Sequence, residues 1–346
     1  MPASAGMTGV ADRLARLIET SGPISVAHYM AEANAYYYGS RDPIGAAGDF
    51  TTAPEISQMF GELVGLCLAD LWFRAGRPQA HYVELGPGRG TLAADALRAM
   101  RAAGLQPPVE MVENSAVLRR AQAARVPHAR WHDDAASLPD DAPLLVVANE
   151  FFDALPVRQL VRTAGSWREL VVTYDESGFT RVPGNPVPLD RVAEEGAIIE
   201  TSPASISVVR ELASRLVKQG GAALIVDYGH VRSGFGDTLQ AVSAHAFADP
   251  WKDPGSGDLT AHVDFEALGG AALAEGVRVA GPVEQGAWLS ALGIQARAAA
   301  LAEATPERAE EIESARERLV APDEMGKLFK VMALVGSGWP HPEGFL

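Results

Sequence analysis

Cysteine is almost missing from this 346-residue sequence, and long apolar runs are missing altogether. The single cysteine, Cys67, excludes an internal disulfide and a cysteine-rich metal site, and its apolar surroundings predict a packed core position. No stretch reaches the ~18 uninterrupted apolar residues of a membrane-spanning helix. The N-terminal residues also lack the apolar centre of a secretory signal. We therefore expect a cytoplasmic location in a bacterium, and a mitochondrial one only if the source is eukaryotic.

Positive charge is also scarce. Lysine and arginine number 29 against 44 aspartate and glutamate residues, which gives a net charge of −15. That charge repels phosphate backbones and anionic membranes, so neither nucleic-acid binding nor membrane insertion is expected. It suits a partner that presents arginine or lysine. The remaining composition, 47% hydrophobic and 21% charged, is ordinary for a globular protein, and the length predicts about two domains.

From His81 onward, short apolar runs alternate with helical patterns, which predicts a parallel α/β sheet. After Pro156 the alternation stops, and two β-rich segments flank Ala164-Gly165-Ser166 as in an antiparallel hairpin. Before the sheet, helices are predicted at 10–34 and 55–74. The predicted parts are a helical N-terminal extension and lid at 1–79, a first part of the core at 80–156, an inserted β subdomain at 157–202, and a second part of the core at 203–346 with a long loop at 230–262.

The strongest local motif is VELGPGRGT, where a predicted strand meets a predicted helix. Gly86, Gly88 and Gly90 allow a sharp turn and a close approach of a ligand to the backbone. The spacing is G-x-G-x-G, with a threonine where a dinucleotide fingerprint requires its third glycine, so NAD binding is not expected. Glu84, just before the loop, would repel a pyrophosphate but suits an ammonium or sulfonium group. The motif therefore favours S-adenosyl-L-methionine as the cofactor.

Acidic residues follow two further predicted strands. Glu113 ends the second strand, where its carboxylate can accept hydrogen bonds from both ribose hydroxyls. Asp133 or Asp134 follows the third strand, where an acid could meet the adenine amino group. Ligands of open α/β sheets bind at the carboxyl ends of the strands, so these acids and Glu84 are expected to share one cofactor site.

Seven longer strings then identify a resemblance. They are GDFTTAPEISQMFGE (48–62), VELGPGRGTLAADALR (83–98), NEFFDALPVRQ (149–159), DYG (227–229), DLTAHVDF (258–265), EQGAWLSALGI (284–294) and MGKLFKVM (325–332). Through them nearly the whole chain resembles the MidA family, the S-adenosylmethionine-dependent protein arginine methyltransferases associated with assembly of respiratory complex I. The resemblance implies a class I, Rossmann-like methyltransferase core with a largely parallel seven-stranded sheet. It also implies an arginine on a complex I subunit as the substrate, and it leaves a homodimer open.

The segment GDFTTAPE precedes the core and carries more functional groups than a linker needs. Pro54 and Glu55 make an ordinary helix start, but that account leaves Asp49 and Thr52 unexplained. As in other methyltransferases with N-terminal additions, the segment is expected to fold over the cofactor. We therefore place Asp49 and Thr52, together with Asn149 at the end of the fourth strand, in the cofactor site.

The string NEFFDALP follows the fourth strand, beside the expected methyl donor. Glu150 and Asp153 are three residues apart, so on a helical turn they would share a face. A carboxylate there can hold a guanidinium by paired, charge-assisted hydrogen bonds. Methylating arginine requires alignment of a nitrogen lone pair more than it requires a strong base. Glu150 and Asp153 are therefore the predicted acceptor carboxylates.

His262 stands alone in DLTAHVDF, after the long loop. No second histidine or cysteine lies at metal-ligand spacing, so a metal is not expected, and we assign His262 to the catalytic site as a residue that closes it. Asp227 and Tyr228 end the fifth core strand and are expected to line the same pocket.

Two other functions remain open on the sequence alone. A non-catalytic assembly chaperone could bind the same cofactor for structural reasons, and the intact glycine loop fits it equally well. The acidic pair after the fourth strand favours the enzyme. An NAD-dependent dehydrogenase is disfavoured by the spacing of the glycines.

Overall fold

The structure, a computed structural model, describes residues 9–40, 51–243 and 246–345. The chain forms two compact units, each assembled from three separate segments. The small unit contains 9–40, 153–207 and 232–262, and the sheet unit contains 51–152, 208–231 and 263–345. The predicted N-terminal extension is thus divided between the two units, while the predicted inserted subdomain and the long loop fall in the small unit.

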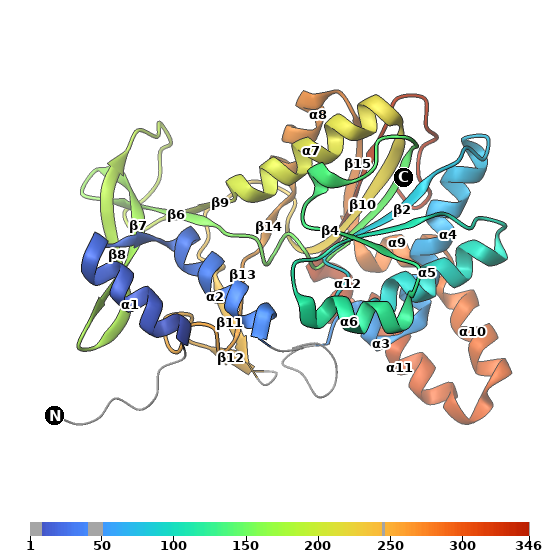
Figure 1. The fold of residues 1–346 in the computed structure, drawn as a ribbon, viewed down its shortest axis with the longest axis horizontal. Helices are drawn as coiled ribbons and strands as arrows, with labels where there is room; N and C mark the ends of the chain where they lie inside the picture. The colour runs from blue at the N-terminus through green and yellow to red at the C-terminus, as the bar shows by residue number, and fades with distance from the viewer. Residues whose placement is uncertain (1–8, 41–50, 244–245, 346) are drawn as a thin grey trace. The chain divides into compact units, whose positions relative to one another are not determined.

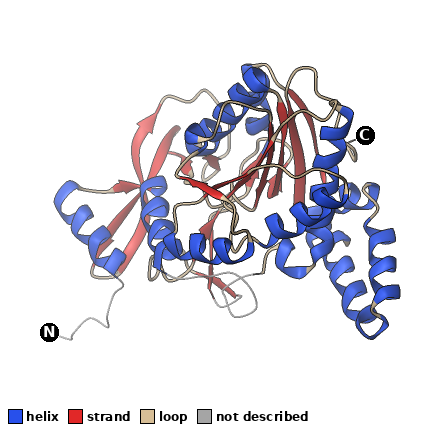
Figure 2. Ribbon diagram, turned by 45° about the vertical axis from the view of Figure 1, so that its right-hand side comes forward, coloured by secondary structure: helices blue, strands red, loops and turns tan. Residues whose placement is uncertain are grey.

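The sheet unit is built around one large β-sheet with helices on both faces (Figure 2). Its strands are β2 (His81–Leu85), β3 (Val109–Val112), β4 (Arg130–His132), β5 (Leu144–Asn149), β10 (Gly221–His230), β14 (Val263–Asp264), β15 (Arg278–Glu284) and β16 (Phe329–Val335). They follow the order β15-β16-β10-β5-β2-β3-β4, and the short β14 pairs with the end of β10. Among these strands, Figure 1 labels β15, β10, β2, β4 and β14. β16 is antiparallel to both neighbours, and the other pairs are parallel. The predicted seven-stranded, largely parallel sheet is confirmed, with β14 as an addition.

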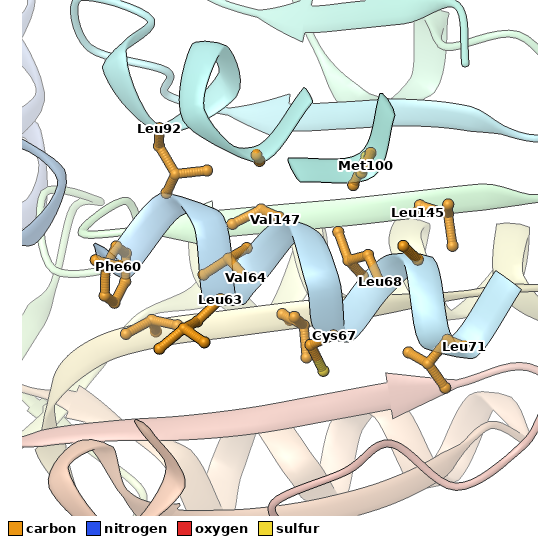
Figure 3. Close-up of a cluster of buried hydrophobic side chains, with 14 of the residues drawn as sticks. Phe60, Leu63, Val64, Cys67, Leu68, Leu71, Leu92, Met100, Leu145 and Val147 are labelled. Atoms are coloured by element: carbon orange, nitrogen blue, oxygen red, sulfur yellow. The ribbon is translucent and has the colours of Figure 1, made fainter. Parts of the chain in front are cut away.

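The central strand β5 shows why the sequence predicts this sheet. Its six residues, LLVVAN, are all buried. A parallel strand covered by helices on both faces is apolar throughout rather than alternating. Leu145 and Val147 belong to the apolar cluster around α4 (Gln58–Arg74), which includes Cys67 (Figure 3). Cys67 is therefore a core residue, as predicted.

Helix α4 packs closely on α5 (Thr91–Ala102) because two glycines of α4 face it. A Cβ atom added at Gly65 would lie 2.4 Å from the carbonyl oxygen of Ala96, and one added at Gly61 would lie 2.7 Å from Cβ of Asp95. Such distances leave no room for a side chain. The remaining helices of this unit are α3 (Ala53–Ile56), α6 (Ala116–Arg125), η1 (Ala135–Ser137), α8 (Phe265–Glu275), α9 (Gln285–Ala291), α10 (Ile294–Ala304), η2 (Pro306–Arg308), α11 (Ala309–Val320) and α12 (Met325–Leu328).

The small unit combines two helices with two antiparallel sheets. Helices α1 (Gly9–Ser21) and α2 (Val26–Ser40) accompany β1 (Ile24–Ser25), β6 (Arg158–Thr163), β7 (Ser166–Asp175), β8 (Gly178–Val187) and β9 (Ile198–Thr201). Helix α7 (Pro203–Gln219) begins in this unit and continues into the segment counted with the sheet unit. β6 and β7 form the predicted hairpin, with Ala164 and Gly165 at φ 51° and 73° in its two-residue turn.

Both N-terminal helix predictions need correction at one point. The helix predicted over 10–34 is interrupted after Ser21, because Gly22 adopts φ 83° and Pro23 cannot donate a backbone hydrogen bond. The helix predicted over 55–74 is likewise two helices, α3 and α4. Ser57 is extended between them, and its hydroxyl accepts a hydrogen bond from the Met59 N–H at 3.2 Å, which starts α4 anew.

The long loop predicted at 230–262 is also wrong in part. It contains β11 (Gln240–Ser243), β12 (Ala246–Ala248) and β13 (Asp258–Thr260), ordered β12-β11-β13 in one antiparallel sheet. Strands of three or four residues are too short to show a period in the sequence. A distant residue fixes β13: Asn34 of α2 accepts a hydrogen bond from the Leu259 N–H at 3.0 Å and donates one to its carbonyl at 2.7 Å.

A buried acid near the β4 edge of the large sheet gives a first testable prediction. Glu110 is fully buried, and its carboxylate contacts Nδ1 of His81 at 3.1 Å, Nε2 of His132 at 2.8 Å, and the Arg130 guanidinium. Removing one partner from a buried ionic group leaves the others uncompensated. We expect Glu110→Ala to lower the free energy of unfolding by about 3 kcal/mol, measured by denaturant titration.

The matched control for this prediction is Asp141→Ala. Asp141 contacts the other ring nitrogen of His81, Nε2, at 2.9 Å, but three quarters of its side chain is exposed. We expect Asp141→Ala to lower the free energy of unfolding far less than Glu110→Ala does, because an exposed partner is already solvated. Equal losses in the two variants would contradict the role given to Glu110.

Candidate active site

The glycine loop between β2 and α5 has the backbone that the sequence predicts. Gly86, Gly88 and Gly90 adopt φ values of 59°, 54° and 79°, a region that side chains disfavour. The Gly86 N–H donates to the Val112 carbonyl at 3.0 Å, and a Cβ atom there would lie 2.9 Å from the Phe151 ring. The turn therefore needs glycine both for its dihedral angles and for the space beside it.

One residue that holds this loop is not predicted from the sequence. Gln122 of α6 is fully buried, and its Nε2 donates to the Gly88 carbonyl at 2.8 Å and to Glu113 Oε2 at 3.2 Å. Its Oε1 accepts a hydrogen bond from Trp131 Nε1 at 2.7 Å. One amide thus joins the glycine loop to the acid at the end of β3. In the sequence Gln122 is one polar residue on a predicted helix, and nothing marks it as buried.

Glu113 is partly exposed at the end of β3, as its proposed role requires. Its Oε1 accepts a hydrogen bond from the Ser115 N–H at 2.7 Å. Burial raises the pKa of Glu113, and the hydrogen bonds from Ser115 and Gln122 lower it in part. Each carboxylate oxygen can accept more than one hydrogen bond, so these contacts orient the group and leave it able to accept ligand hydroxyls.

Glu84 is more deeply placed than the sequence suggests. Only 3% of it is exposed, and its Oε2 accepts a hydrogen bond from the Tyr82 hydroxyl at 2.7 Å. Tyr82 and Glu84 are two residues apart on β2 and therefore share a face of the sheet. Burial raises the pKa of Glu84 to about 8, although the hydrogen bond from Tyr82 favours the charged form.

This pKa predicts a pH-dependent stability. At pH values between 4.5, the ordinary pKa of a glutamate, and about 8, Glu84 in the folded protein holds a proton that the unfolded chain has released. The cofactor-free protein should therefore lose stability from this group as pH rises from 5.5 to 8, by up to about 1.4 kcal/mol per pH unit. The free energy of unfolding, measured by chemical denaturation over that pH range, should fall less steeply with pH in Glu84→Gln, because its amide cannot titrate. Identical slopes in the parent and the variant would rule out the raised pKa.

The two aspartates after β4 make local contacts on the surface. Asp133 Oδ1 forms an ion pair with Arg119 Nη2 at 2.7 Å, and its side chain is largely exposed. Asp134 accepts a hydrogen bond from the Ser137 N–H at 2.8 Å and caps η1, which lowers the pKa of its carboxyl group. Asp133 therefore presents a carboxylate to solvent at the β4 end, while Asp134 serves a helix terminus.

The end of β5 carries the other predicted groups. Asn149 is buried, and its Nδ2 donates to Glu150 Oε1 at 3.1 Å. Its Oδ1 is also buried and accepts no hydrogen bond from any residue that the structure describes.

Glu150 adopts φ 49°, and its N–H donates to the Val226 carbonyl at 2.9 Å. Its Oε1 also accepts a hydrogen bond from the Ala53 N–H at 3.2 Å, next to Thr52. Asp49 lies outside the described residues.

Asp227 holds the loop that follows β5. It is fully buried, and its carboxylate accepts hydrogen bonds from the N–H groups of Phe151 at 3.2 Å, Phe152 at 2.9 Å and Tyr228 at 3.0 Å. The helical turn predicted for Glu150 and Asp153 is not formed, since residues 150–155 make bends and a turn. The two carboxylates therefore do not share a helical face as predicted, because backbone hydrogen bonds to Asp227 replace the helical ones.

In the small unit, Asp153 is 5% exposed and has acidic and phenolic neighbours. Asp153 and the equally buried Asp258 both act on Tyr38, whose pKa lies well above its ordinary value because of burial and then of these two carboxylates. The backbone N–H of His262 donates to Thr238 Oγ1 at 2.9 Å. Tyr38 and Asp258 were not predicted, because nothing in the sequence brings α2 and β13 together.

These residues fit the predicted cofactor. The three left-handed glycines leave the backbone open to a ligand, Asn149 offers a buried carbonyl oxygen to an ammonium or hydroxyl donor, and Glu113 offers a carboxylate one strand away. Across 9–40, 51–243 and 246–345, no group of three or more His, Cys, Asp or Glu residues could hold a metal ion. No helix within those ranges is both long and apolar enough to span a membrane.

Known proteins agree with this arrangement. Residues 63–283 match the model of a family described as S-adenosyl-L-methionine-dependent methyltransferases. The mitochondrial protein arginine methyltransferase NDUFAF7 homologue of Drosophila melanogaster is 38% identical over 96% of this chain and 86% of its own length. The NDUFAF7 protein of Mus musculus is 35% identical over 94% of this chain and 83% of its own length. The Homo sapiens protein is 33% identical over 98% of this chain and 85% of its own length.

A solved structure agrees as well. A Burkholderia thailandensis protein bound to S-adenosyl-homocysteine superposes with a TM-score of 0.85 and is 29% identical, covering 97% of this chain and 93% of that one. The sheet order, the glycine loop and these relatives lead to one assignment. The chain belongs to the MidA-like family of class I methyltransferases and uses S-adenosyl-L-methionine as its methyl donor.

Proposed function

We propose that this methyltransferase modifies arginine side chains of a protein partner, and that Glu150 is the carboxylate that binds the guanidinium. The observation that carries this proposal is the placement of Glu150 at the carboxyl end of β5. Its left-handed backbone and two hydrogen bonds to Oε1 hold the carboxylate in place while the residue stays partly exposed. The curated relatives named above are protein arginine methyltransferases, which supports the same acceptor.

The residues would contribute orientation and electrostatics. Bound S-adenosyl-L-methionine would supply an electrophilic methyl group. A guanidinium nitrogen would form the new N–CH₃ bond as the S–CH₃ bond breaks, S-adenosyl-homocysteine would leave, and the nitrogen would release one proton to solvent. A carboxylate paired with the other guanidinium nitrogens keeps the positive charge away from the attacking nitrogen. It also fixes the direction of that nitrogen, which is the larger part of the task when two molecules must react. No strong base is needed in this scheme.

Asp153 and His262 are the other two residues proposed to be catalytic, and both belong to the small unit. Asp153 is buried beside Tyr38 and Asp258, so the small unit holds two carboxylates where a cationic group would be stabilised. The backbone of His262 is fixed by Thr238, whose hydroxyl donates to Glu200. The proposed role of His262 is closure of the site rather than proton transfer.

The proposed cofactor residues lie on the sheet unit. The backbone at Gly86, Gly88 and Gly90 would lie closest to the ligand. Glu113 would accept hydrogen bonds from the ribose hydroxyls. Glu84 and Asn149 would receive the ammonium group, and a cation there would favour the charged form of Glu84. Asp133 or Asp134 would meet the adenine, and Thr52 would lie at the border of the site, with Asp49 proposed from the sequence alone.

We also propose a respiratory complex I subunit as the partner and the bacterial cytoplasm as the location. The net charge of −15 complements a partner surface that presents arginine. Formation of a homodimer stays a prediction.

Mass spectrometry tests the proposed activity. Purified full-length protein is incubated with methyl-labelled S-adenosyl-L-methionine and candidate partner peptides, each paired with a copy in which lysine replaces the central arginine. Label on arginine, and none on the lysine copies, is the expected result. Cofactor that binds but is never consumed with any candidate would instead support the non-catalytic chaperone. Label on another residue type would replace arginine as the acceptor.

A further inference from the structure

The short helix α3 is attached to the glycine loop by a side-chain hydrogen bond. Thr91 is the first residue of α5 and directly follows Gly90. Its hydroxyl donates to Glu55 Oε1 at 2.5 Å, although the two residues are 36 positions apart in the chain. Gly90, the N-cap residue of α5, has no side chain to accept hydrogen bonds from the first N–H groups of the helix. Glu55 instead supplies an acidic group at the start of α5 from another element.

The other end of α3 is attached to the proposed acceptor carboxylate. The Ala53 N–H donates to Glu150 Oε1 at 3.2 Å, two residues before Glu55. Between these contacts, the Glu55 and Ile56 N–H groups donate to the Thr52 carbonyl at 2.9 and 3.2 Å. A single helical turn therefore connects the loop after β2 to the group after β5.

Helix α3 cannot hold this position by its own helical bonds. It has four residues, and an isolated turn of that length is unstable because its first hydrogen bond orders several residues at once. Ala53 and Pro54 are buried, which anchors one side of the turn. The bond between Glu55 and Thr91 anchors the side next to the glycine loop.

We propose that Glu55 and Thr91 are positioning residues for methyl transfer. They fix α3 against the glycine loop, so that the Ala53 N–H orients the carboxylate of Glu150. This inference rests on the proposed acceptor role of Glu150. Neither residue needs to touch the arginine or the donated methyl group. It follows that their loss should change turnover more than cofactor affinity.

Hydrogen exchange tests the attachment without reference to any methyl acceptor. Thr91→Val removes the hydroxyl and keeps the branched shape, whereas Thr91→Ser keeps the hydroxyl. In the full-length protein, amides of residues 51–57 should exchange about 10-fold faster in Thr91→Val than in the parent, because α3 has lost a charge-assisted bond. Thr91→Ser should restore slow exchange. Unchanged exchange in Thr91→Val would overturn the inference.

Turnover then separates positioning from a merely structural contact. With an arginine peptide that the parent methylates, kcat of Thr91→Val should fall about 10-fold, while KM for the peptide and cofactor Kd stay near the parental values. Glu55→Gln retains a carbonyl oxygen for the Thr91 hydroxyl, so its kcat should fall less than that of Glu55→Ala. The control is Glu311→Gln on α11, which breaks an exposed ion pair with Arg308 of η2 and should change neither the exchange of residues 51–57 nor kcat.

Each further outcome has a definite meaning. Faster exchange with parental kcat would overturn the positioning role and leave only a structural contact. If the parent protein methylates no arginine but Thr91→Val still exchanges faster, the attachment of α3 is supported and the proposed function is rejected instead. If Thr91→Val fails to fold, as judged by circular dichroism, the comparison of Glu55→Gln with Glu55→Ala takes its place.

Discussion

Replacing Gly88 with valine should lower the affinity for S-adenosyl-homocysteine by at least ~100-fold, which is ~2.8 kcal/mol of binding free energy. Gly88 adopts φ 54°, where a β-branched side chain is strained, and its carbonyl accepts the hydrogen bond from Gln122. A backbone that relaxes to relieve the strain would move both the loop and Glu113, which Gln122 also binds. The added side chain would also take up space in the proposed cofactor site. Isothermal titration calorimetry measures the loss directly.

The matched control is Gly165→Val in the hairpin turn of the small unit. Gly165 has a similar φ of 73°, and nothing lies within 4 Å of a Cβ atom placed there. This variant carries the same kind of backbone strain without approaching the glycine loop. It should lower stability but leave the affinity unchanged. Parental affinity in Gly88→Val, or an equal loss in Gly165→Val, would refute the placement of the cofactor.

The sequence predicts the sheet unit well because its signals are local. Each strand is a short apolar run, and each following helix begins within a few residues, as in HYVEL and the loop after it. The hairpin at Ala164 and Gly165 is equally local. By contrast, the strands within 240–260 depend on α2, and the units interleave segments that are far apart in the chain. Such pairings leave no periodic pattern to read.

The same distinction explains the site. Gly86, Gly88 and Glu113 are recognisable because spacing places them at strand ends. Gln122 is not recognisable, and Asp227 is predicted only as a residue that lines the pocket, because the roles of both consist of hydrogen bonds to backbone groups in distant segments. The predicted helical turn after β5 fails for this reason as well. A buried carboxylate on the neighbouring strand takes the N–H groups of Phe151 and Phe152 and imposes a different backbone.

Glu150→Gln should reduce methyl transfer to an arginine peptide by at least ~10-fold, or ~1.4 kcal/mol of transition-state stabilisation. Glutamine keeps a carbonyl oxygen for the Ala53 N–H and the Asn149 amide, and it keeps the size of the side chain. The substitution therefore removes the charge while the contacts that hold the loop survive. A charge-assisted hydrogen bond is worth more than a neutral one, so the guanidinium is held less firmly and less of its charge is drawn from the attacking nitrogen.

Cofactor affinity decides how a loss of activity in Glu150→Gln is interpreted. If Glu150 belongs to the acceptor side, calorimetry with S-adenosyl-homocysteine should give a Kd close to that of the parent. A variant that has lost cofactor binding would place Glu150 on the donor side, and the acceptor carboxylates would then lie elsewhere. Glu313→Gln is the control, because it neutralises an exposed glutamate paired with Arg316 on α11 and should leave both measurements unchanged. Methylation by Glu150→Gln at the parental rate would remove Glu150 from the mechanism, since the substitution takes away both the negative charge and one of the two acceptor oxygens.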